Sequence, residues 1–166
     1  MRTIIADSSS LILLYKCGAA AVFLNNCCCI IPETVRYELT AGGHIGSDYF
    51  SQCIEKKTLT VKRLSNDHEK VKKLHAGENG VIFIYEEGAG EFVLIDDGRG
   101  AAYCRDNGIP YINALLAVKI LLFSGKISYE ESSVMNQWLR KNGRYSRGII
   151  EWAENADSDK LENFLF

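Results

Sequence analysis

The feature of this sequence that most constrains its fold is a pair of apolar runs that each end on aspartate. One run spans residues 3–7, Thr-Ile-Ile-Ala-Asp, and the other spans residues 92–97, Phe-Val-Leu-Ile-Asp-Asp. Strands buried on both faces of a parallel sheet read as continuous hydrophobic runs, and open α/β sheets bind ligands outside the carboxyl ends of their strands. We therefore expect Asp7 and Asp96 to face one crevice, with Asp97 as a candidate third member.

Segments typical of strands and of helices alternate along the chain. Further strands are expected at residues 27–31, 59–63 and 108–112. Helices are expected after Asp7, after Pro32, over 48–57, over 67–74, from Glu78, where Gly77 ends the preceding helix, and after Gly98, with two or three more from Ala114 onward. This alternation predicts an α/β protein with right-handed crossovers, a three-layer α/β/α sandwich around a mainly parallel sheet of about five strands. Residues 59–63 alternate in polarity, which favours an edge strand.

Length and composition indicate one domain in a reducing compartment. With 166 residues, we expect a single domain, with its body in residues 1–147 and an acidic helix or tail of the same domain in residues 148–166. The six cysteines lack zinc spacing, so they are expected to be buried or partly buried free thiols. The N-terminal apolar run is too short for a signal peptide, and no later run is long enough to span a bilayer. A cytoplasmic protein with no membrane contact is expected.

The net charge of −2 hides an asymmetry near the C-terminus. A basic segment over 119–147 precedes an acidic stretch over 151–162. Four of its cations lie near Trp138 and Tyr145, a basic and aromatic mixture compatible with single-stranded RNA, namely Arg140, Lys141, Arg144 and Arg147. The same residues would serve equally as a partner-docking surface or a solvated helix face, and the acidic stretch could shield them in its own or a neighbouring subunit.

Two glutamates at helical positions, Glu38 and Glu78, could join the aspartates. Two carboxylates about 4 Å apart repel by ~4 kcal/mol at an effective dielectric near 20, so a cluster of three or four needs protons or a cation. All-oxygen ligation favours Mg²⁺ or Mn²⁺, and a phosphate ester is the substrate class that such an ion suggests. Taken singly, Asp7 fits a helix N-cap better than a metal ligand, Asp96 could equally cap the helix after its strand, and Glu38 has the pattern of a solvated side chain.

The order and context of these acids resemble the PIN-domain nucleases. The resemblance runs from Ile4 to about Arg147. It rests on Ile-Ala-Asp-Ser-Ser at 5–9, Ile-Pro-x-x-Val-x-x-Glu-Leu at 31–39, the Gly-Glu step at 77–78, Leu-Ile-Asp-Asp-Gly-Arg-Gly-Ala-Ala at 94–102 and Gly-Ile-Pro at 108–110. Within the family, the sequence is most similar to the prokaryotic branch related to VapC toxins.

What this resemblance implies is a divalent-metal-dependent endoribonuclease that uses Mg²⁺ or Mn²⁺ and leaves a 5′-phosphate and a 3′-hydroxyl. The implied catalytic acids are Asp7, Glu38, Glu78 and Asp96. The implied metal ligands are Asp7, Glu78, Asp96 and Asp97. Supporting roles are expected for Ser8 or Ser9 beside Asp7, and for Arg99 against a phosphate or an acid. The sequence departs from many relatives at Asn79-Gly80, where glycine weakens a helix start by roughly 1 kcal/mol relative to alanine.

The resemblance also implies partners. A VapC-like toxin would need a small antitoxin, and homodimers are common in the family. The alternative from another class is a non-catalytic PIN-like module that binds RNA or protein, and metal-dependent cleavage separates the two. Other phosphate-handling classes fit worse, because the sequence has neither Gly-x-Gly-x-x-Gly after its first strand nor a P-loop, and no Asp-x-Asp-x-Thr. His44, His68 and His75 have no spacing that marks a catalytic base, so we expect them on the surface.

Overall fold

The computed structural model of the chain describes residues 1–65, 71 and 74–166. Within these residues, the strands are β1 (Thr3–Ala6), β2 (Cys28–Pro32), β3 (Leu59–Lys62), β4 (Phe92–Leu94) and β5 (Tyr111–Ile112). The helices that connect them are α1 (Ser8–Lys16), α2 (Ala20–Asn26), α3 (Glu33–Thr40), α4 (Ser47–Glu55), α5 (Ala76–Glu86) and α6 (Gly98–Asp106). The C-terminal elements are α7 (Ala114–Phe123), α8 (Tyr129–Asn142), α9 (Arg147–Asn155), α10 (Ser158–Leu161) and a 3₁₀ turn, η1 (Glu162–Phe164).

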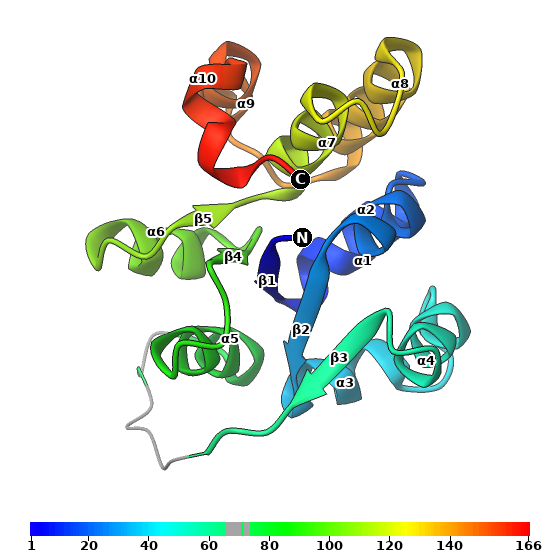
Figure 1. The fold of residues 1–166 in the computed structure, drawn as a ribbon, viewed down its shortest axis with the longest axis vertical. Coiled ribbons are helices and arrows are strands. Elements are labelled where there is room, and N and C mark those ends of the chain that lie inside the picture. Colours follow the sequence, from blue (N-terminus) through cyan, green and yellow to red (C-terminus); the bar gives the residue numbers. More distant parts are fainter. Residues whose placement is uncertain (66–70, 72–73) are drawn as a thin grey trace.

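The strands form a single parallel sheet in the order β3-β2-β1-β4-β5. In Figure 1, α5 and α6 lie on the left of this sheet, while α1, α2 and α4 lie on the right. The predicted α/β/α sandwich and the edge position of β3 are therefore confirmed. From β1 the chain moves outward through β2 to β3, and it then returns to β4 on the other side of β1. Adjacent strands β1 and β4 thus flank a topological switch point, where open α/β sheets bind their ligands.

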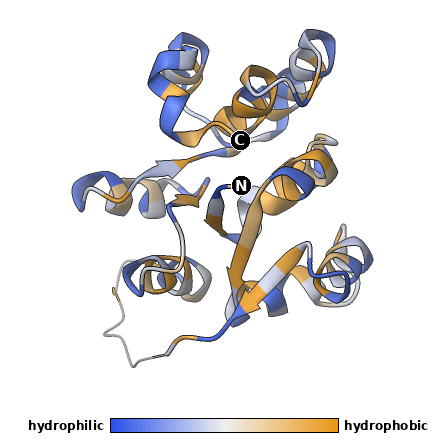
Figure 2. Cartoon of the chain, in the orientation of Figure 1, coloured by the Kyte–Doolittle hydropathy of each residue, from blue (hydrophilic) through white to orange (hydrophobic). Residues whose placement is uncertain are grey.

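The core sits on both faces of the central strands. Ile4, Ile5 and Val93 are fully buried, as the continuous apolar runs predict. Helix α7 is apolar on nearly its whole circumference and is largely orange in Figure 2. It needs this composition because it packs between α1 and α2 on one side and α8 and α9 on the other. The C-terminal residues close the core, with the ring of Phe164 on Phe92 and that of Phe166 on Phe23.

Several expectations about elements need correction. Residues 114–166 form four helices and a 3₁₀ turn rather than two or three helices, because Gly143 and Ala156 interrupt the segment after α8 and α9. Gly77 lies inside α5 and does not end an earlier helix. Strand β4 ends at Leu94, two residues before Asp96. The helix expected over 67–74 falls mostly outside the described residues, as does His68. The boundary expected after residue 147 coincides with the first residue of α9.

The remaining global expectations concern thiols, histidines and membranes. All six cysteines are free, but Cys28 is exposed, since it is the first residue of β2. His44 and His75 are exposed, as expected. In the part of the chain that the structure describes, no helix has the length and hydrophobicity needed to cross a bilayer.

Candidate active site

Asp7 is both a helix cap and a buried acid. It follows β1 directly, and its Oδ1 accepts the backbone N–H of Ser10 at 2.8 Å, while its Oδ2 accepts the Ser9 hydroxyl at 2.8 Å. Only 4% of the residue is exposed. Burial and the nearby Asp96 carboxylate raise the pKa of Asp7 to about 7. The capping role that the sequence suggested for Asp7 is therefore confirmed, and its carboxylate also lies near a second acid.

Asp96 lies near Asp7 and is held on both of its oxygens. Its Oδ2 accepts the backbone N–H of Ala114 at 2.9 Å, at the start of α7, and its Oδ1 accepts the hydroxyl of Tyr145. Burial raises the pKa of Asp96, and these hydrogen bonds oppose the rise. The Ser10 hydroxyl influences the pKa of both aspartates, although it makes no hydrogen bond within the described residues. Two acidic groups and one unsatisfied hydroxyl thus lie together beside the switch point, with Asp7 and Ser10 buried and Asp96 half-buried.

Glu38 reaches the same region from α3. Its Oε2 accepts the hydroxyl of Ser8, the first residue of α1. The start of α5 also lies against it, since a Cβ on Gly77 would stand 3.2 Å from both carboxylate oxygens of Glu38. Ser8 therefore positions Glu38, whereas Ser9 binds Asp7.

Glu78 and Asp97 form a hydrogen-bonded pair between the first turns of α5 and α6. Glu78 accepts the backbone N–H of His75 at 2.8 Å, and Asp97 caps α6 through the N–H of Arg99 at 2.8 Å. Burial, followed by Asp97, raises the pKa of Glu78. Burial also acts on Asp97, but its hydrogen bonds with Glu78 and with backbone N–H groups outweigh it and lower the pKa. Of the two carboxyl groups, Glu78 is therefore the one whose protonated form the fold favours.

Asn79 and Gly80, where the sequence differs from many of its relatives, each have a structural role. The buried Asn79 side chain accepts the N–H of Val71 and donates to the carbonyl oxygens of Val71, Leu74 and His75, which fixes the chain that leads into α5. A Cβ on Gly80 would stand 2.8 Å from the Cβ of Pro32, so the glycine allows α5 to pack closely on the start of α3. These two residues hold Glu78 in place.

Sequence reasoning missed two contacts at this site. The Nη2 of Arg99 lies 2.6 Å from the Nε2 of His75, so this histidine stands at the rim of the cluster and not on an unrelated surface. Its only sequence signal is a glutamate three residues later, the spacing of a capping box. Tyr145 was assigned to an RNA-binding mixture, but its hydroxyl contacts Asp96 instead, 49 residues away in the sequence.

The four cations predicted to bind RNA divide into two kinds. Arg140 pairs with Glu154 at 2.6 Å, and Arg147 pairs with Glu151 at 2.7 Å. Lys141 and Arg144 are exposed and form no ion pair with the described residues. The acidic stretch therefore neutralises two of the four within the same chain.

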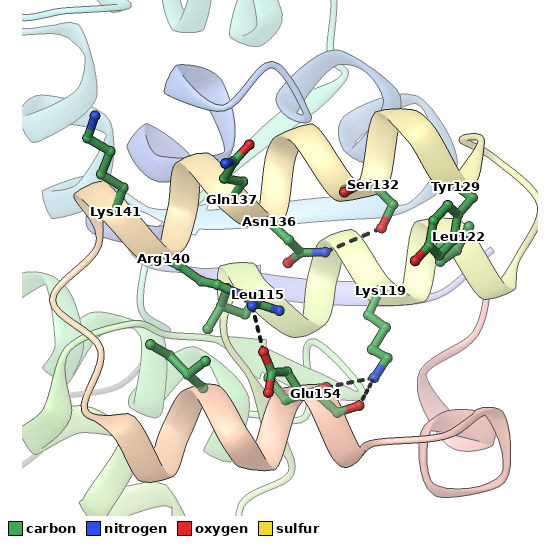
Figure 3. A pocket seen from close by; sticks show the side chains of 13 residues that line it. Leu115, Lys119, Leu122, Tyr129, Ser132, Asn136, Gln137, Arg140, Lys141 and Glu154 are labelled. Atoms are coloured by element: carbon green, nitrogen blue, oxygen red, sulfur yellow. Dashed lines mark hydrogen bonds and ion pairs between the residues drawn. The ribbon is translucent and has the colours of Figure 1, made fainter.

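A prominent hollow in the described structure does not coincide with the acids. It measures about 860 Å³ and lies between α7, α8 and α9 (Figure 3). Lys119 crosses it and donates to the carbonyl oxygens of Ala153 at 2.8 Å and Glu154 at 2.6 Å, which caps the C-terminal end of α9 (Figure 3). A second hollow of about 750 Å³ lies beside the start of α5 and is lined by Pro32 and Asn79. We locate the site by its acids, because neither hollow contains a carboxylate cluster.

The acids fit a hard divalent ion as a pair of ligands and not as a cage. No three acid, thiol or imidazole groups among the described residues are arranged to hold one ion. Mg²⁺, however, commonly binds through one or two carboxylates together with waters and substrate oxygens. Asp7 and Asp96 offer two such carboxylates, and the unsatisfied Ser10 hydroxyl beside them can bond a coordinated water.

The family model of the PIN domain matches residues 3–154. No curated protein and no solved structure matches the chain.

Proposed function

The chain belongs to the PIN-domain family, a family of nucleases, and we propose that it is a divalent-metal-dependent endoribonuclease. The observation that carries this proposal is the pair of neighbouring carboxylates, the buried Asp7 and the half-buried Asp96, at the switch point between β1 and β4. A buried acid whose pKa is raised by burial and by a neighbouring acid costs the fold stability, so the placement of Asp7 beside Asp96 favours a role in binding a cation.

Each acid has a distinct part in this proposal. Asp7 and Asp96 hold Mg²⁺ or Mn²⁺, with Glu78 and Asp97 beside them as further ligands or proton carriers. When bound, the ion would polarise the phosphoryl oxygen and lower the pKa of a water. Glu38, held by Ser8, faces the start of α5 and completes the acidic rim.

The Glu78 and Asp97 pair can handle the proton that hydrolysis requires. Attack by water forms a new P–O bond, breaks the bond between phosphorus and the 3′-oxygen, and leaves one proton to move from the water to that oxygen. With the pKa of Glu78 raised and that of Asp97 lowered, Asp97 can accept the proton of the water while Glu78 donates a proton to the 3′-oxygen, and transfer of a proton from Asp97 to Glu78 restores the pair. The products are a 5′-phosphate and a 3′-hydroxyl.

Cations near the acids supply the contacts to RNA. Arg99, at the first turn of α6, pairs with Asp97 at 3.9 Å and lies against His75. Of the four predicted RNA-binding cations, Lys141 and Arg144 form no ion pair with the described residues and remain available for phosphates. RNA binding by these residues would weaken as salt is added.

The narrower form of the proposal is a VapC-like toxin that acts in the cytoplasm, is restrained by an antitoxin protein and forms a homodimer. It rests on the resemblance of the acid motifs alone. Growth arrest upon expression, relieved by Asp7→Asn, would support it, and unimpaired growth with active wild-type nuclease would count against it.

The second candidate function is a non-catalytic module that binds RNA or protein. Two observations favour it, namely that no three acids of the described residues are arranged around one ion, and that both oxygens of Asp7 and of Asp96 already accept hydrogen bonds.

One experiment separates the two candidates. Wild type, Asp7→Asn and Asp96→Asn are incubated with single-stranded and structured RNAs in Mn²⁺, Mg²⁺ or EDTA, and the new ends are mapped. Asp157→Asn is the matched control, because Asp157 caps α10 as Asp7 caps α1 but lies at the surface. We expect metal-dependent cleavage by wild type and the control and none by the two site variants. RNA binding without cleavage by wild type would favour the non-catalytic module.

A further inference from the structure

The loop between α8 and α9 contacts Asp96 through one residue, Tyr145. The hydroxyl of Tyr145 donates to Oδ1 of Asp96, while Oδ2 of the same carboxylate accepts the N–H of Ala114. One donor comes from the start of α7 and the other from the loop that follows α8. Because each oxygen has its own donor on a different element, the plane of the Asp96 carboxylate is fixed.

The ring of Tyr145 packs against Gly143, at the C-terminal end of α8. A Cβ on Gly143 would stand 2.2 Å from Cε2 of Tyr145 and 2.7 Å from the carbonyl oxygen of Leu139. Gly143 has φ −78° and ψ 155°, an extended conformation open to any residue, so the backbone does not require glycine here. The glycine makes room for the ring, which lets the hydroxyl reach Asp96.

We propose that Tyr145 is a positioning residue that orients the Asp96 carboxylate for metal binding. Tyr145 contacts neither substrate nor ion in this role, and it acts through Asp96. The inference rests on the proposed function only in taking Asp96 as a metal ligand. Partners that hydrogen-bond a metal ligand typically contribute 10- to 100-fold to affinity or activity, because they fix the orientation of the ligand.

The test measures Mn²⁺ affinity directly, by isothermal titration calorimetry at one pH. The variants are Tyr145→Phe and a matched control, Tyr85→Phe, whose hydroxyl makes no hydrogen bond within the described residues. We expect Tyr145→Phe to weaken Mn²⁺ binding by about 10-fold, and the control to bind as wild type does. Equal affinity in wild type and both variants would overturn the proposal, as would a wild type that binds no Mn²⁺.

A second variant displaces the ring while keeping its hydroxyl. Gly143→Ala should weaken Mn²⁺ binding in the wild-type background and have little further effect in the Tyr145→Phe background, because both changes remove the same contact. If the losses of Mn²⁺ affinity in the two single variants add up in the double variant, then Gly143 does not act through the Tyr145 ring, and the proposed packing of the ring on Gly143 is refuted. Thermal unfolding of each variant identifies any that fail to fold.

The affinity measurement is independent of RNA cleavage. A wild type that binds Mn²⁺ but cuts no RNA overturns the proposed nuclease and leaves the role of Tyr145 to be decided by affinity. Where cleavage is present, Tyr145→Phe should lower kcat at limiting Mn²⁺ and leave KM for RNA unchanged, and a change confined to KM would contradict a positioning role.

Discussion

Replacing Asp7 by asparagine should stabilise the metal-free protein at alkaline pH. Asparagine keeps the shape of the side chain, can still accept the N–H of Ser10 and can donate to the hydroxyl of Ser9, so the cap of α1 survives. What it removes is a buried carboxylate whose pKa is raised from 3.8 to about 7 by burial and by Asp96. The substitution therefore isolates the cost of ionising this group inside the fold.

The sign and size of the effect follow from proton linkage. Between pH 3.8 and about pH 7 the folded chain holds a proton on Asp7 that the unfolded chain has lost, so the free energy of unfolding falls as the pH rises through this window. A shift of about three units corresponds to about 4 kcal/mol, which is the upper limit for the gain in Asp7→Asn at pH 8. At pH 4 the gain should nearly vanish.

Urea unfolding in EDTA at pH 4, 6 and 8 measures this difference. Asp157→Asn is the control, since its exposed carboxylate has a pKa lowered by the N–H of Lys160 and its removal brings no alkaline gain. Added Mn²⁺ should stabilise wild type and not Asp7→Asn. If Asp7→Asn is no more stable than wild type at pH 8 in EDTA, then burial of Asp7 carries no ionisation cost and the argument for a cation fails.

Three further changes test the packing and chemistry around the site. Gly80→Ala should lower the free energy of unfolding by about 1 kcal/mol, because crowding against Pro32 costs about 1–3 kcal/mol and the higher helix propensity of alanine offsets about 1 kcal/mol of that cost. Gly148→Ala is the control, since the space around Gly148 is open, and urea unfolding should show it stabilised by up to about 1 kcal/mol. Glu78→Gln can still accept at the start of α5 but carries no titratable proton, so cleavage should fall by about 100-fold or more while the thermal midpoint is retained. Lys119→Met should lower the free energy of unfolding by about 2 kcal/mol, measured by calorimetry, because two carbonyl oxygens lose a charged donor.

The parts of the fold that sequence could predict are those encoded by neighbouring residues. The continuous apolar runs before Asp7 and Asp96 predict buried parallel strands, and the structure places both runs in the centre of the sheet. Even the position of β3 at an edge follows from its local alternation in polarity. The C-terminal third was predicted less well, because the breaks after α8 and α9 depend on how these helices pack and not on proline or a run of glycines.

The residues of the candidate site also divide into those that the sequence indicates and those that only the structure reveals. The acids could be proposed from the sequence, since Asp7 and Asp96 follow apolar runs, Glu78 lies in the first turn of a helix, and Glu38 lies in a helix within a recognisable motif. The contacts of Tyr145 and His75 could not, because each depends on where a loop passes in space, and neither residue lies in a pattern typical of a site. The basic segment could be found as a charge pattern, but its division into paired and unpaired cations depends on the packing of α9 against α8.

Three glycines explain why the acids converge. Gly77 lies against Glu38, Gly80 against Pro32, and a Cβ on Gly100 would meet Ile95 at 2.3 Å, with the carboxyl carbon of Glu78 at 3.7 Å. In the sequence, Gly77 looked like a helix terminator and Gly80 like a weak point. In the structure, their missing side chains allow the first turns of α3, α5 and α6 to approach one another. Larger residues at these positions would separate the carboxylates, so the spacing of the acids depends on the glycines as much as on the strands that present Asp7 and Asp96.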